Sequence, residues 1–109
     1  MALPYVMESV SDLWDHIAYV MEYAPNGFPQ EFGWKPEEQM TFEIAFRQLH
    51  EGVDIAVPPA AMERRQSLHA LLDRSMAEYT TGDRAAARNM LAEFETDLFT
   101  PDGKLRGDP

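Results

Sequence analysis

Residues 58–101 read PPAAMERRQSLHALLDRSMAEYTTGDRAAARNMLAEFETDLFTP, and this stretch decides the fold class. Apolar residues recur in it at intervals of three and four on both sides of Gly82-Asp83, which is the spacing of amphipathic helices. Gly82 suits the left-handed position that ends a helix, and Asp83 suits the N-cap of the next one. The stretch therefore predicts two helices joined by a tight turn, over residues 59–80 and 84–99.

Part of this stretch resembles one helical hairpin of a tetratricopeptide repeat. The residues that carry the resemblance are Tyr79, Gly82, Asp83, Ala87, Leu91 and Pro101. They cover about 25 residues, and the pattern does not recur at the repeat's period elsewhere in the chain. A repeat array needs several units to bury its faces, so a generic helical hairpin explains the same residues.

The first half of the chain has the same apolar spacing, which predicts two further helices over residues 9–24 and 37–51. Ser9 or Ser11 suits the N-cap of the first helix, and Pro36 fits the first turn of the second. Four helices with short connections are typical of an all-α bundle.

The 109 residues have the length of a single domain. We expect residues 1–99 to form a single-domain, all-α bundle of about four helices. Residues 53–57 alternate weakly and end at two prolines, so we interpret them as a connector. Residues 100–109 hold two glycines and two prolines, with only Leu105 to anchor them, so we expect a frayed, flexible C-terminal tail.

The composition excludes several classes of function. The absence of cysteine excludes disulfide scaffolds, thiol catalysis and thiolate zinc sites. No apolar run approaches the roughly 18 residues needed to span a bilayer, and we expect a cytoplasmic protein. Nine Lys and Arg residues face 19 Asp and Glu residues, a net charge of −10. This charge disfavours nucleic acid and anionic membranes as partners, because both present negative charge.

Charge and aromatic residues are concentrated in the first half of the chain. Residues 1–54 carry ten acids and two bases, whereas residues 55–109 carry nine acids and seven bases. Nine of the twelve aromatic residues also precede residue 54. We therefore expect the working surface on the first half and a scaffold in the second.

The predicted loop over residues 24–36 is the least ordinary feature of the sequence, because it holds three aromatic residues within seven positions. Exposed aromatic residues beside charges serve as interface anchors, but the rings could equally fold back as a lid on the core. We expect Trp34 to be the anchor, and Phe28 and Phe32 to belong to the lid. The predicted partner-binding residues are Phe28, Glu31, Phe32, Trp34, Glu37 and Glu38.

Three histidines are the first candidates for chemistry, and each has an aspartate four residues away. The pairs are His16 with Asp12, His50 with Asp54, and His69 with Asp73. Such pairs are common solvated contacts on one helix, and the histidines fall on three separate predicted segments, so we expect surface or rim positions. Neither metal-ligand spacing nor a nucleophile motif is present, and we expect no catalytic residue, metal or cofactor.

A small acidic helical domain without catalytic motifs is typical of a binding protein that neutralises a basic partner, so we do not expect an enzyme. Bacterial immunity proteins and antitoxins that inhibit nucleic-acid- or nucleotide-directed toxins have this character. Two alternatives stay open: a helical adaptor or regulatory module that binds a peptide or helix, and a phage-encoded inhibitor of a nucleic-acid enzyme. A homodimer is also compatible with the sequence. The second choice of surface is the basic face formed by Arg64, Arg65 and Arg74.

Overall fold

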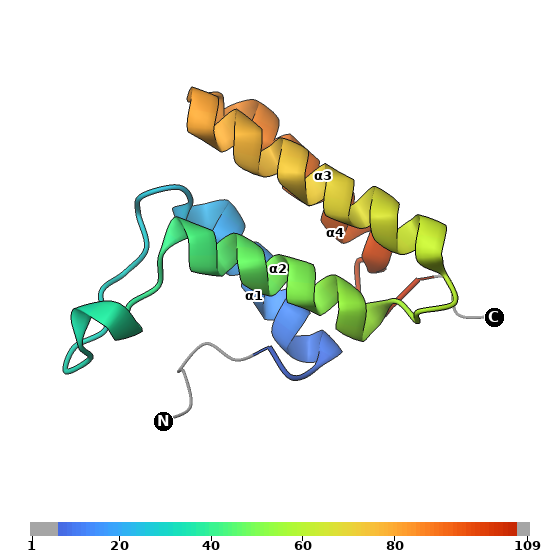
Figure 1. Cartoon of the computed structure of the whole chain (residues 1–109), viewed down its shortest axis with the longest axis horizontal. Coiled ribbons are helices and arrows are strands. Elements are labelled where there is room, and N and C mark those ends of the chain that lie inside the picture. Colours follow the sequence, from blue (N-terminus) through green and yellow to red (C-terminus); the bar gives the residue numbers. More distant parts are fainter. Residues whose placement is uncertain (1–6, 107–109) are drawn as a thin grey trace.

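Four α-helices make up most of the computed structural model, which describes residues 7–106 (Figure 1). They are α1 (Val10–Tyr23), α2 (Phe42–Ala56), α3 (Met62–Thr81) and α4 (Arg84–Leu98), with a short 3-10 turn, η1 (Pro36–Glu38), between α1 and α2. Among the described residues, pairing of strand type is limited to an isolated bridge between Phe99 and Leu105. The expected all-α class is confirmed.

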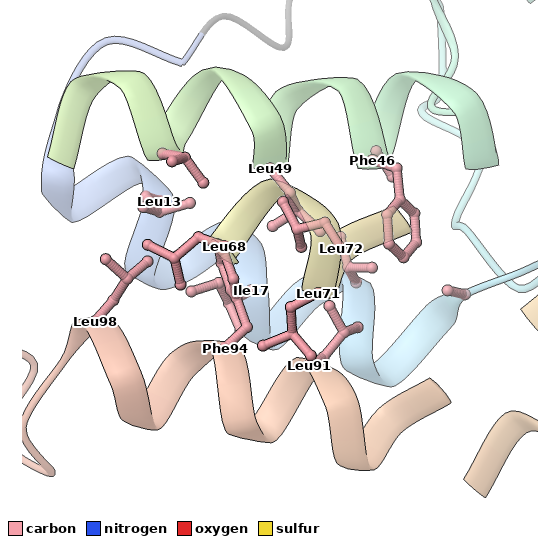
Figure 2. Packing of buried hydrophobic residues seen from close by; sticks show 14 of the residues in the cluster. Leu13, Ile17, Phe46, Leu49, Leu68, Leu71, Leu72, Leu91, Phe94 and Leu98 are labelled. Carbon is pink, nitrogen blue, oxygen red and sulfur yellow. The ribbon is translucent and has the colours of Figure 1, made fainter. Parts of the chain in front are cut away.

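The helices form two hairpins that pack on each other, α1 with α2 and α3 with α4 (Figure 1). α2 lies against α3, and α1 lies against α4, so all four helices contribute to one core. Figure 2 shows leucine and phenylalanine side chains from every helix meeting in its centre. The fully buried side chains drawn there include Leu13, Ile17, Phe46, Leu49, Leu68, Leu72, Leu91, Phe94 and Leu98.

Local capping chemistry fixes several helix ends where the sequence predicted them. The Ser9 hydroxyl accepts the backbone N–H of Asp12 at 3.1 Å, and the Asp12 carboxylate accepts that of Ser9 at 3.1 Å, which closes a capping box at α1. Gly82 adopts φ +96° at the end of α3. Asp83 then caps α4 by accepting the backbone N–H of Ala86 at 3.0 Å. These three capping assignments are confirmed.

α2 does not lie where the sequence placed it. Residues 36–38 form only the 3-10 turn, and α2 begins after its N-cap Thr41. It continues to Ala56, so the interpretation of residues 53–57 as a connector was wrong. The reason is that Val53 is fully buried and extends the apolar face of α2 by another turn, which outweighs the helix-breaking tendency of Gly52.

The segments that flank the second hairpin also differ in detail from expectation. α3 begins at Met62 and not near residue 59, because Pro58 accepts the backbone N–H of Ala61 at 3.0 Å in a preceding turn. Beyond α4, the backbone N–H of Arg106 donates to the Leu98 carbonyl at 2.7 Å, so residues 100–106 turn back on the helix. Flexibility of the tail stays a prediction, and residues 107–109 lie outside the described residues.

His16 is buried in α1, and the surface or rim position expected for it was wrong. Its Nε2 donates to the Ala45 carbonyl of α2 at 2.9 Å, and Asp12, its expected partner, caps α1 instead. Burial lowers the pKa of His16, and the hydrogen bond to the Ala45 carbonyl offsets part of that effect. A neutral imidazole therefore joins α1 to α2.

We expect His16 to make the fold sensitive to acid. The unfolded chain takes up this proton near the ordinary pKa of 6.5, whereas the folded chain takes it up only at lower pH. The unfolded state thus binds more protons between the two values, and the free energy of unfolding falls as the pH falls below about 6.5. Denaturant unfolding from about pH 7.5 to about pH 5 measures this slope. His16→Gln should reduce it, and an unchanged slope would contradict the assignment.

Candidate functional site

The segment between α1 and α2, residues 24–41, projects beyond the ends of the helices around η1 (Figure 1). It is attached to the core at both ends, because Ala24 and Met40 are buried. Between these two points the backbone is irregular and lies largely at the surface. We call residues 31–38, the outermost part of this segment, the aromatic loop.

Phe28 belongs to the core, as the lid interpretation predicted. Only 8% of it is exposed, and its ring lies 5.5 Å from that of Tyr19 on α1. Buried aromatic pairs of this kind stabilise by more than their buried area alone. As an inner residue, Phe28 can support the aromatic loop but offers little surface to a partner.

Phe32 is fully exposed at 104%, so its expected role as a lid was wrong. Trp34 is 36% exposed and lies two residues further on. Its backbone N–H donates to the Glu31 carbonyl at 3.3 Å, and Gly33 takes φ +86° in the turn between them. This left-handed turn directs the Phe32 ring away from the core, and glycine adopts it without strain.

Gln39 holds the turn in place, and nothing in the sequence had pointed to it. Its buried side chain accepts the backbone N–H of Glu31 at 2.7 Å through Oε1. Its Nε2 donates to the carbonyls of Glu31 and Trp34, each at 3.1 Å. A single amide therefore forms three hydrogen bonds with the loop, which fixes both ends of the turn that carries Phe32.

The acidic residues expected to surround the aromatic rings divide into two groups. Glu31 and Glu37 are exposed and available as rim charges. Glu38 is half-buried, and its carboxylate accepts the backbone N–H of Lys35 at 2.8 Å. Glu38 thus stabilises η1, and its side chain is a weaker candidate for direct contact with a partner.

A cavity of about 350 Å³ lies beside the aromatic loop, between residues 25–30 and the start of α2. Phe28, Met40 and Phe42 contribute its apolar lining, and Glu43 lies among its polar lining residues. A cavity of this size matches the volume of a small-ligand site or of a few inserted side chains.

Replacing Gln39 by leucine should release the aromatic loop while leaving the helices folded. The change removes three hydrogen bonds and leaves the Glu31 and Trp34 backbone groups without this partner. We expect faster amide exchange at Glu31 and a loss of about 1–3 kcal/mol in the free energy of unfolding. Gln30→Leu, at an exposed position in the same segment, is the matched control. Equal exchange in both variants would show that Gln39 does not hold the loop.

The basic face considered as a second surface is largely committed to the fold. Arg65 donates to the carbonyls of Asp54 and Val57, both at 2.8 Å, and so closes the end of α2. Arg64 donates to the Asp97 carbonyl at 3.0 Å. Arg74 is exposed on α3. Two of the three arginines therefore hold helix ends together, which makes this face a weaker candidate than the aromatic loop.

His50 and His69, which fall on separate predicted segments, lie against each other. His50 is on α2 and His69 on α3, and their Nδ1 atoms are 2.6 Å apart. Each histidine also faces the aspartate of the other helix and not that of its own, so the expected same-helix pairs at these two positions were wrong. The apolar spacing of each helix could not reveal this contact, because it depends on the register of α2 against α3.

Within residues 7–106, no group of three or more side chains is placed to hold a metal ion. We therefore expect a chelator to leave the melting temperature of the purified protein unchanged. A drop of several degrees on chelator treatment, reversed by adding back a divalent metal, would contradict this expectation. The same described residues contain no helix with the length and apolar character needed to cross a membrane.

Comparison with known proteins places the chain in no family. No protein-family model matches it, no curated protein is significantly similar to it, and no solved structure matches it. The arguments about its function therefore rest on the geometry and charge of its own residues.

Proposed function

We propose that this chain is a small acidic binding protein that neutralises a basic protein partner, as an immunity protein or antitoxin against a nucleic-acid- or nucleotide-directed bacterial toxin. The aromatic loop carries the proposal, because it presents Phe32 and Trp34 on a turn fixed by Gln39. An ordered loop loses less conformational entropy on binding than a mobile one, so more of its contact energy contributes to affinity.

The charge distribution supports a basic partner. Glu31 and Glu37 flank the exposed rings, and the first 54 residues carry a net charge of −8. A protein that binds phosphate groups presents positive charge at its site, and an acidic inhibitor is complementary to that surface. Such complementarity accelerates association and selects the partner. Most of the affinity comes from the aromatic rings of the loop, which the partner buries when it binds.

The experiment is capture of the partner followed by measurement of its affinity. The tagged chain is incubated with a lysate of its source cells, and the bound protein is identified, purified and titrated. Trp34→Ala and Phe32→Ala should each weaken binding by about 2 kcal/mol, which is roughly 30-fold in Kd. Met62→Ala, at an exposed apolar residue on α3, is the matched control and should bind as the parent does.

Two further results decide the class of partner. Glu31→Lys with Glu37→Lys should slow association, and raising the salt concentration should slow association of the parent in the same way. Expression of the partner alone should arrest growth, and co-expression of the parent chain, but not of Trp34→Ala, should restore it. If all loop variants bind as tightly as the parent, the site lies elsewhere, and the exposed face around Arg74 is the next to test.

A second candidate function is a helical adaptor or regulatory module that binds a peptide or helix. The cavity beside the aromatic loop favours it, since the half-buried ring of Phe42 offers an apolar contact within a lining that is otherwise largely polar. Insertion of apolar side chains there would depend little on salt, in contrast to binding steered by charge. Phe42→Ala should then weaken binding more than the two charge reversals do.

A phage-encoded inhibitor of a nucleic-acid enzyme would share the salt dependence of the first proposal but would not restore growth against a toxin.

A further inference from the structure

His50 and His69 form a symmetrical arrangement across the contact between α2 and α3. Their rings are nearly parallel, with an interplanar angle of 12° and centroids 4.9 Å apart. The two Nδ1 atoms face each other at 2.6 Å. The outer nitrogens face carboxylates of the opposite helix, His50 Nε2 at 3.2 Å from Asp73 and His69 Nε2 at 3.2 Å from Asp54.

These distances indicate which protonation state of the two rings satisfies every contact. An imidazole nitrogen that lies 3.2 Å from a carboxylate oxygen forms an attractive contact only when it carries a proton, because two lone pairs would otherwise repel each other. The same reasoning requires one proton between the two Nδ1 atoms, which are too close for two bare or two protonated nitrogens. The state in which all three contacts are attractive at once therefore has three ring protons and one positive charge.

The surrounding charges balance that state. Asp54 and Asp73 supply two negative charges, and Arg65 adds a positive charge through its contact with Asp54 at 3.4 Å. The charged groups that act on His50 belong to α2 and α3, and they are Asp54, Asp73 and His69. With one shared proton the whole cluster is neutral, which favours this state at a partly buried contact.

A shared proton fits this geometry better than a metal ion does. Two imidazole nitrogens that bind one tetrahedral zinc ion lie about 3.3 Å apart, as follows from zinc–nitrogen bonds of about 2 Å. The Nδ1 atoms are closer than that, and no third metal-ligating side chain completes a site among the described residues. The distance is that of a strong hydrogen bond between an imidazolium and a neutral imidazole.

We propose that His50 and His69 form a pH-operated switch between α2 and α3. The switch is closed when the pair holds three ring protons, one of them shared between the two Nδ1 atoms, and it opens when the pair gains or loses a proton. A second proton places two positive N–H groups against each other, so the rings must separate. Loss of one proton leaves two lone pairs facing each other, either between the two Nδ1 atoms or between one Nε2 and its aspartate, so one of the three contacts between the helices breaks. Both rings are partly exposed, so water can deliver or remove the proton without unfolding the core.

The direction of the pKa shift at His50 agrees with opening of the switch in acid. Burial lowers the pKa of His50 most strongly, the charge of Asp73 raises it, and the charge of His69 lowers it again. His50 therefore takes up its proton below the ordinary pKa of 6.5, whereas the unfolded chain takes it up near that value. Stability falls there as the pH falls, and we expect a second fall at higher pH, where loss of the shared proton breaks one of the three contacts.

The decisive experiment is a histidine NMR titration of the full-length chain. Long-range proton–nitrogen spectra at about pH 7 should show both Nε2 atoms protonated and both Nδ1 atoms at shifts midway between the protonated and bare values. The two rings should titrate together in two steps, as a coupled pair does. Two neutral rings that titrate independently, each in one step, would overturn the proposal.

Unfolding measurements provide the second test. The stability difference between the parent and His50→Gln should pass through a maximum and decline on both sides of it, whereas the difference for His16→Gln should only rise with pH. Asp73→Asn removes one of the carboxylates that favour the charged pair, so it should move both titration steps to lower pH. A His50→Gln difference that rises steadily with pH, like that of His16→Gln, would rule out the switch.

Discussion

Replacing Phe46 by alanine should lower the free energy of unfolding by about 3–5 kcal/mol, one of the two largest effects that we expect from a change in this chain. Phe46 is 1% exposed and lies on the face of α2 that meets α3. Its ring packs edge-on against Phe42 at 5.2 Å and Tyr79 at 5.9 Å, so the substitution removes contacts on both helices. Domains of this length have a total stability of roughly 5–15 kcal/mol, and the loss is a large share of it.

Phe32→Ala is the matched control for Phe46→Ala, because it makes the same chemical change at a fully exposed site. We expect it to alter the free energy of unfolding by less than about 0.5 kcal/mol. Urea unfolding followed by circular dichroism measures both variants. Similar losses in the two variants would mean that Phe32 packs against the core in solution, and the aromatic loop could not then be an exposed binding surface.

Helix ends that depend on neighbouring residues were predictable from the sequence. Ser9, Gly82 and Asp83 act on backbone groups within a few residues of themselves, so their chemistry is visible locally. The start of α2 was not predictable in this way, since Pro36 and Thr41 both suit a helix start. Burial of Met40 and the bonds of Gln39 to the loop decide between them, and both depend on the folded chain.

The candidate site shows the same division between local and tertiary information. The clustering of aromatic and acidic residues marked the loop, but Phe28 and Phe32 have the same chemistry and similar surroundings in sequence. Phe28 is a core residue because it packs against Tyr19, and Phe32 is exposed because it lies in the turn at Gly33. The aromatic loop as a region was therefore predictable, whereas the role of each ring within it was not.

The contact between His50 and His69 could not be predicted from the residue pattern of either helix alone. The two residues are 19 positions apart, and each has a more obvious partner on its own helix. The register between α2 and α3 brings the rings together, and that register is set by core side chains such as Leu49 and Leu72.

Gly52 allows α1 and α2 to approach closely, and we expect Gly52→Ala to destabilise the chain. A Cβ atom at this position would clash with Leu13 Cδ1 and lie 3.0 Å from Leu13 Cγ. Leu13 is fully buried, so its side chain has little room to move. Overpacking of this kind costs about 1–3 kcal/mol, which should exceed the roughly 1 kcal/mol that alanine gains over glycine within a helix.

The double variant isolates that contact. Leu13→Ala alone should cost about 2–5 kcal/mol, because it leaves a cavity between the two helices. In that background the atoms that would meet the new Cβ are absent, so Gly52→Ala should now stabilise the chain by about 1 kcal/mol through helix propensity and partial filling of the space. The sign of the Gly52→Ala effect should therefore reverse between the two backgrounds in urea unfolding. If Gly52→Ala stabilises the parent chain as well, α1 and α2 do not pack as closely as this, and the position of His16 against the Ala45 carbonyl would have to change with them.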